Sequence, residues 1–245
     1  MRYITVLFIL ITMSSLAQAS NEITCYSSIY APYSYLKEGR PTGIDIDIVT
    51  AIAKKIDLSV SFKIIPWSRL KQNVRAGKID CAMAFLKSST YTDNMIFMNS
   101  PITTGYFTLF IEENNTEKLQ TLTDFYGLTV GVNRGFKAPL VFNQAVANNL
   151  IKKYEVGDEQ QSLQMLLKSR LSGVLTDKVV GMFNLQQLGI TTIVPLKKPI
   201  TSIAVYLIFS KNMQVSGLVK KFDIALAALR QEGTYQLIID KYLDN

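Results

Sequence analysis

Apolar residues recur with helical spacing in one stretch, residues 43–56, around which the rest of the chain is organised. They fall on one face of a helix: Ile44, Ile48, Val49, Ile52, Ala53 and Ile56. Asp45 and Asp47 stand in the first turn and Lys54 and Lys55 in the last, which suits the two ends of the helix dipole. The pattern predicts a helix over residues 43–56 that packs on a sheet.

Strands and helices alternate on both sides of this stretch. Apolar runs predict strands at 23–28, 59–66 and 78–85, and a second helix begins around Trp67. Short links in this order favour a parallel sheet with right-handed crossovers. Polar sequence at 36–43 and 87–100 predicts loops.

A second unit with the same order begins at Leu128. Its expected elements are strands 128–132, 154–156, 173–177 and 190–196, and helices 138–149, 159–170 and 179–189. Two long β-rich runs, 102–112 and 201–210, flank this unit, and the tail is helical.

The predicted fold is therefore α/β, with two lobes joined by two hinge strands. Lobe 1 comprises residues 20–103 and 206–245, and lobe 2 comprises residues 104–205 including the hinge strands. Two such lobes enclose a cleft that closes about the hinge. A cleft at the carboxyl ends of parallel strands is where α/β proteins place ligands.

Residues 1–19 have the layout of a secretory signal peptide. Arg2 is followed by an apolar core at 4–13 and by the small-residue site Ala17-Gln18-Ala19. We expect cleavage after Ala19 and export to a bacterial periplasm.

Composition excludes several functions. The formal net charge is +7, but the basic residues are scattered, so a nucleic-acid partner is poorly supported. The absence of histidine removes Ser-His-Asp and Cys-His catalysis and His-based zinc sites. We expect no cofactor and no metal. The two cysteines, Cys25 and Cys81, fall in predicted strands and are interpreted as two small buried hydrophobes, with a disulfide as the alternative.

Several motifs together resemble the family 3 extracellular solute-binding proteins, the periplasmic receptors of amino-acid ABC importers. The family signature of a glycine followed by alternating apolar and acidic residues is matched by Gly43 to Ala53. Further similar segments are YAPYSY, GKIDCAMA, VGVNRG, GVLTD and the C-terminal ALRQEGTYQLIIDKYLDN. The resemblance covers nearly all of the chain after residue 19, and implies a type II periplasmic-binding-protein fold.

The resemblance also implies ligand contacts, with departures at the carboxylate site. The position of the family's carboxylate-binding arginine holds Thr92, and the usual Ser/Thr pair is replaced by Phe136 and Lys137. Losing such an arginine costs on the order of 2–5 kcal/mol unless another cation replaces it. Candidate cations are Arg69, Lys87, Arg134 and Lys137. For Arg69 and Lys87, the alternative is an ordinary solvated position.

The remaining expected contacts are acidic, polar or aromatic. Asp177 matches the acid that receives the ligand's ammonium, with a helix N-cap as its alternative role. Asn133 lies in the VGVNRG segment that opens lobe 2. Tyr30, Trp67 and Phe85 are predicted to line the cleft, where aromatic rings suit a cation. Trp67 would otherwise be plain core.

These features favour a monomeric receptor that is not an enzyme and that presents a small polar solute, amino-acid-like or cationic, to a membrane ABC permease. One alternative is a sensory module that docks on a membrane signalling protein. Another is a dehydratase-like enzyme, since a few relatives on this fold are periplasmic dehydratases. Loss of the carboxylate-binding arginine argues against that alternative.

Overall fold

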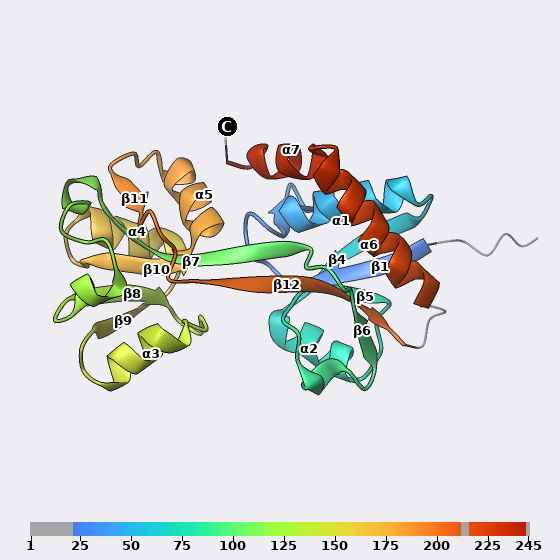
Figure 1. The fold of residues 1–245 in the computed structure, drawn as a ribbon, viewed down its shortest axis with the longest axis horizontal. Coiled ribbons are helices and arrows are strands. Elements are labelled where there is room, and N and C mark those ends of the chain that lie inside the picture. Colours follow the sequence, from blue (N-terminus) through green and yellow to red (C-terminus); the bar gives the residue numbers. More distant parts are fainter. Residues whose placement is uncertain (1–21, 212–215, 244–245) are drawn as a thin grey trace, which may run out of the picture.

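The computed structural model describes residues 22–211 and 216–243 of the 245-residue chain (Figure 1). The predicted signal peptide lies outside these residues. None of the helices in this part of the chain has both the length and the apolar character that crossing a membrane requires. As predicted, the described residues form two α/β lobes, with long strands running from one to the other.

The first lobe is built on three parallel strands in the order β4-β1-β5. Its main elements are β1 (Glu22–Ser27), α1 (Ile44–Lys55), β4 (Ser59–Ile64), α2 (Trp67–Arg75), β5 (Cys81–Phe85), α6 (Ser216–Gln231) and α7 (Thr234–Asp240). Helices α1 and α6 cover one face of the sheet and α2 the other (Figure 1). The predicted strand–helix order of this lobe is confirmed.

Three short strands lie where the sequence predicted loops. Strands β2 (Tyr35–Lys37) and β3 (Arg40–Thr42) form a hairpin. Strand β6 (Met95–Phe97) pairs with a crossing strand at the edge of lobe 1. The loop predictions for 36–43 and 87–100 are wrong at these residues, because tertiary pairing stabilises segments too short to show a hydrophobic period.

The second lobe repeats the same plan with parallel strands in the order β10-β8-β9. Its main elements are β8 (Thr129–Asn133), α3 (Leu140–Ala147), β9 (Lys152–Val156), α4 (Glu159–Leu167), β10 (Gly173–Asp177), α5 (Lys178–Leu188) and β11 (Ile193–Pro195). Helix α3 packs on one face, and α4 and α5 pack on the other (Figure 1). The described residues also form three 3-10 turns: η1 (Ser89–Tyr91), η2 (Glu113–Asn115) and η3 (Leu122–Phe125).

Strands β7 (Thr103–Glu112) and β12 (Thr201–Ser210) join the lobes. They pair with each other in antiparallel register over Thr103–Phe107 and Thr201–Val205. Beyond this segment β12 pairs with β5 and β6, and β7 pairs with β10 and β11. Each strand therefore belongs to both lobes, and the predicted lobe boundaries at 103/104 and 205/206 fall inside these two strands.

Helix α1 confirms the predicted amphipathic helix, and its apolar face is buried in the lobe 1 core. Its N-terminus is fixed by Gly43, whose φ of 135° is a conformation that L side chains rarely adopt. A Cβ at this position would overlap the backbone carbonyl of Tyr33. The Asp45 amide donates to that carbonyl at 2.9 Å, so the loop around Tyr33 is held directly against the helix.

Cys25 and Cys81 form a disulfide, so the prediction of two separate buried thiols is wrong. The strands β1 and β5 are neighbours, and their parallel register places the two cysteines opposite each other. Their Cα atoms lie 4.6 Å apart, within the range that a disulfide spans. The bond links segments 56 residues apart inside the lobe 1 core.

Candidate functional site

The two lobes contact each other through a tyrosine and a carboxylate. The Tyr33 hydroxyl, from lobe 1, donates to Asp177 Oδ1, from lobe 2, at 3.0 Å. Both residues are largely buried, at 8% and 1% exposed. Tyr35 and Phe183 extend this contact, with ring centroids 5.9 Å apart. The lobes therefore meet where the loop before α1 reaches the carboxyl end of β10.

Asp177 ends β10 and caps helix α5, which confirms its alternative role as an N-cap. Its Oδ1 accepts from the amides of Val179 and Val180 at 3.0 and 3.2 Å. Its Oδ2 accepts from the Tyr106 amide on β7 at 3.0 Å. Burial raises the pKa of Asp177, and these hydrogen bonds oppose that shift. Direct contact of Asp177 with a ligand stays a prediction.

A second carboxyl, Glu159, lies beside this position and was not among the predicted site residues. It is the first residue of α4, and its Oε2 accepts from Asn133 Nδ2 at 2.5 Å. Its Oε1 is buried and has no hydrogen-bond partner among the described residues. Burial raises the pKa of Glu159 to about 7, although hydrogen bonds from Thr176 and Asn133 lower it. The charge of Asp177 also raises the pKa of Glu159.

Asn133 ends β8 and orients Glu159 rather than standing free. Its Oδ1 accepts from the Ser162 hydroxyl at 3.1 Å while its amide group holds Glu159. The side chain thus ties β8 to the first turn of α4.

Tyr30 faces the same acids from lobe 1. Its ring stacks on Tyr33 at a centroid distance of 5.7 Å. Surrounding protein raises the pKa of the Tyr30 hydroxyl, and the charges of Asp177 and Glu159 add to this rise, although 39% of the whole residue is exposed. The structure therefore brings Tyr30, Asn133 and Asp177 together, with Glu159 as the additional member.

Trp67 begins α2 and is 40% exposed, so it is not plain core. Its ring packs on Phe85 at a centroid distance of 5.0 Å, and Phe85 in turn contacts Tyr91 edge-on at 5.1 Å. Phe85 is only 1% exposed, so in this conformation it supports Trp67 from behind and does not present its own ring to solvent.

The expected cationic and carboxylate-site residues are dispersed. Arg69 and Lys137 are exposed, and Lys87 Nζ lies 4.5 Å from the centre of the Tyr206 ring on β12. Thr92 is also exposed, and its hydroxyl donates to the Ser89 carbonyl at 2.9 Å. It closes the 3-10 turn η1.

Phe136 packs edge-on against Phe107, with ring centroids 5.2 Å apart. Phe107 stands opposite Asp177 in the β7–β10 ladder, so this aromatic pair flanks the acidic group.

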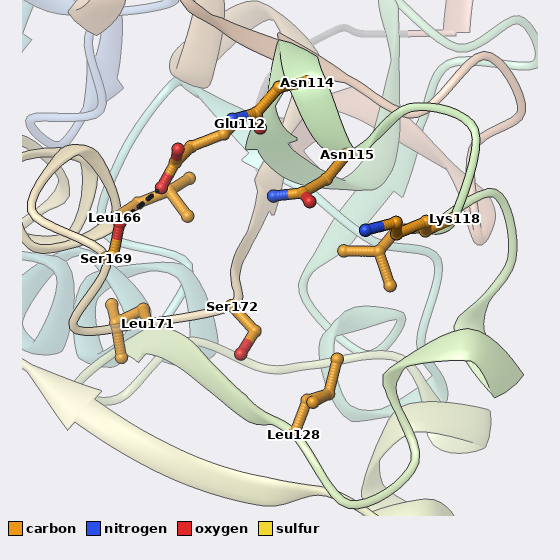
Figure 2. A pocket seen from close by; sticks show the side chains of 10 residues that line it. Glu112, Asn114, Asn115, Lys118, Leu128, Leu166, Ser169, Leu171 and Ser172 are labelled. Atoms are coloured by element: carbon orange, nitrogen blue, oxygen red, sulfur yellow. Dashed lines mark hydrogen bonds between the residues drawn. The ribbon is translucent and has the colours of Figure 1, made fainter.

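One cavity of about 440 Å³ lies away from these residues, at the far end of β7 (Figure 2). Among the residues that line it, Ser169 donates to Glu112 at 2.9 Å. Its lining contains none of the predicted site residues. Within residues 22–211 and 216–243, no group of acidic or thiol side chains is placed to hold a metal ion.

Comparison with known proteins agrees with this architecture. The model of the bacterial extracellular solute-binding proteins, family 3, matches residues 23–245. A probable amino-acid-binding protein, YxeM of Bacillus subtilis (strain 168), is 25% identical over 87% of this chain and 80% of its own. Substrate-binding domain 2 of Lactococcus lactis GlnP, in an open conformation, superimposes with a TM-score of 0.77, 22% identity and coverage of 93% and 97%.

A histidine kinase sensor domain with similarity to periplasmic binding proteins shares the fold at a TM-score of 0.67 and 21% identity, covering 91% of this chain and 96% of that domain. The fold is that of the type II periplasmic binding proteins, as predicted. The chain belongs to the bacterial extracellular solute-binding proteins, family 3. Members of this family bind solutes outside the cytoplasm.

Proposed function

We propose that this protein captures a small polar solute, amino-acid-like or cationic, between its two lobes and presents it to a membrane ABC permease. The solute would be enclosed by Tyr30 and Trp67 from lobe 1 and by the Asn133–Glu159–Asp177 edge of lobe 2. Closure of the lobes about β7 and β12 would be the change that the permease recognises.

The observation that carries this proposal is the way the two lobes are connected. In the described part of the chain only β7 and β12 pass between the lobes, and paired strands of this kind can bend as a hinge. Elsewhere the lobes contact each other at the start of α5, through the hydrogen bond from Tyr33 to Asp177 and through Val180, which packs against the lobe 1 core. A neutral hydrogen bond of this kind contributes about 1 kcal/mol net, and a bond to a charged group about 1.5–3, so the polar part of this contact is a small barrier to opening.

The family and the curated relatives are binding proteins, which supports a receptor that is not an enzyme. The residues gathered at the site also lack an imidazole or a thiol that could act as a nucleophile. We further propose that the protein is exported to a periplasm by cleavage after Ala19, and that it acts there as a monomer.

Thermal-shift screening of the purified protein with amino acids, polyamines, organic acids and oligopeptides tests the receptor function. A solute that raises the melting temperature is expected to bind one-to-one in calorimetry. Failure of every class to bind would overturn the proposal. Capture of a permease rather than a kinase by the ligand-bound form in membranes then separates transport from sensing.

A variant tests whether binding takes place between the lobes. Trp67→Ala is expected to lower the affinity for the solute about tenfold, which is the effect of losing one cation–π or stacking contact. The control Tyr126→Ala removes an aromatic ring of similar exposure from lobe 2, away from the proposed site, and should leave the affinity unchanged. Equal affinities for wild type and Trp67→Ala would show that the solute does not contact this wall.

A further inference from the structure

Glu159 carries a buried oxygen to which no described residue donates with good hydrogen-bond geometry, although Thr176 lies close enough to lower the pKa of the carboxyl. Its Oε1 is buried, without a hydrogen-bond partner among the described residues, although the neighbouring Oε2 is held by Asn133. A buried polar atom without a partner costs about 1–3 kcal/mol, and more when it is charged. An unpaired buried acceptor requires an explanation, and at the edge of the proposed site we take the missing donor to be a group of the ligand.

We propose that Glu159 Oε1 receives a positively charged nitrogen of the bound solute, and that this contact makes the receptor selective for cationic solutes. The solute would carry this ammonium or guanidinium group on its side chain, apart from any α-ammonium, and the group would point toward the start of α4. This inference rests on the proposed receptor function and names the substrate class of that same site.

Asp177 is less available for this contact. Its Oδ1 already accepts from Tyr33, Val179 and Val180, and its Oδ2 accepts from Tyr106. The residue is 1% exposed. The hydrogen bonds around Asp177 join the two lobes and cap α5, whereas Glu159 retains an oxygen with no such task.

The charges around Glu159 are negative. The groups whose charges raise its pKa are Asp177, at the end of β10, and Asp158, the N-cap of α4. From lobe 1 the neighbouring titratable group is the hydroxyl of Tyr30.

The basic residues that follow these strand ends do not neutralise the carboxyl. Arg134 and Lys178 are both exposed, and neither is among the charges that shift the pKa of Glu159. On β9, Lys153 pairs with Glu155 at 2.8 Å. A solute cation would therefore be the compensating charge, and a charge-assisted hydrogen bond is roughly twice as strong as a neutral one.

The arginine–citrulline pair tests this selectivity, because the two solutes have the same length and differ in a charged guanidinium and a neutral urea. Calorimetry at pH 8 is expected to give at least tenfold tighter binding of L-arginine. Because the pKa of Glu159 is about 7, it is mostly ionised at pH 8 and mostly protonated at pH 6. The preference should therefore shrink severalfold at pH 6.

The variant Glu159→Gln keeps the shape and the bond from Asn133 but removes the charge. It is expected to bring the arginine–citrulline ratio close to one. Glu155→Gln, an exposed acid on the adjoining strand β9, is the matched control and should retain the wild-type ratio. The pH dependence of the wild-type ratio gives a second measurement that does not depend on how the variant folds.

The outcomes are distinguishable. Three results would overturn the selectivity and leave the receptor function standing. Citrulline could bind as tightly as arginine or more tightly, the ratio could be unchanged by Glu159→Gln, or the screen could return only neutral or acidic solutes. If the screen returns another cation, that cation and its uncharged analogue replace the pair, with the same expected ratios. If no solute binds at all, the receptor function fails, and the selectivity fails with it.

Discussion

Asp45 carries a buried carboxyl whose charge should destabilise the fold near neutral pH. The residue lies in the first turn of α1 and is 1% exposed. Its Oδ1 has no hydrogen-bond partner among the described residues. Burial raises the pKa of Asp45 to about 7, a hydrogen bond from Thr103 opposes this shift, and the charge of Asp177 adds to it. Replacement by asparagine keeps the shape of the side chain and removes the charge.

The expected effect follows from proton linkage. The folded protein holds a proton on Asp45 up to about pH 7, whereas the unfolded chain releases it near its ordinary pKa of 3.8. Stability from this group is therefore present at low pH and is lost as the pH rises from about 4 to 7. Roughly three pKa units correspond to ~4 kcal/mol. The stability of Asp45→Asn relative to wild type should rise by about that amount between pH 4 and pH 8.

Urea denaturation of the ligand-free protein, followed by circular dichroism at several pH values, measures this difference. Asp124→Asn is the control, because Asp124 should affect stability with the opposite pH dependence. Asp124 is exposed and accepts from the amides of Gln120 and Thr121, which hold its pKa below the ordinary value. The stability that Asp124 contributes is therefore present above its ordinary pKa and is lost as the pH falls below it. A difference between Asp45→Asn and wild type that stays constant from pH 4 to pH 8 would refute the assignment of a raised pKa to Asp45.

Two further predictions concern the cores of the lobes. Gly181→Ala in α5 should destabilise lobe 2 by about 1–3 kcal/mol, because the new Cβ would overlap the buried ring of Phe110. The control is Gly217→Ala in α6, where the added Cβ has no neighbouring atom within 4 Å, so this substitution should be neutral or slightly stabilising in the same denaturation assay. Equal effects of the two substitutions would contradict the packing argument. Replacing Cys25 and Cys81 together by alanine should lower the free energy of unfolding by about 4 kcal/mol on the loop-entropy model, and a midpoint like that of wild type would show that the disulfide contributes little.

Long elements could be predicted from the sequence because their periods repeat. The helix at 43–56 shows three helical turns of the same apolar face, and the structure forms it over Ile44–Lys55. Strands β2, β3 and β6 have three residues each, which is too short for an alternation to be recognised. Strand β6 exists because it pairs with β12, more than a hundred residues later in the chain, and no local pattern encodes that pairing.

The disulfide depends on a register that the sequence does not reveal. Both cysteines could be placed in strands, but a bridge requires that β1 and β5 be neighbours and that Cys25 face Cys81. A shift of one residue in either strand would point one sulfur to the opposite face of the sheet. The compartment expected from the N-terminus permits a disulfide, whereas only the strand register decides that these two residues form one.

The position of Glu159 follows from the topology of the sheet and not from a local motif. An acidic residue in the first turn of a helix is normally explained by the helix dipole and by solvent exposure. In parallel strands, however, every strand end and the helix start that follows it lie on the same edge of the sheet. Asn133 and Asp177 lie on that edge as the ends of β8 and β10, so the residues after β9 belong there too. The three strand ends together therefore predict that Glu159 lies beside Asn133 and Asp177. It is also the acid of this edge that retains an oxygen for a ligand.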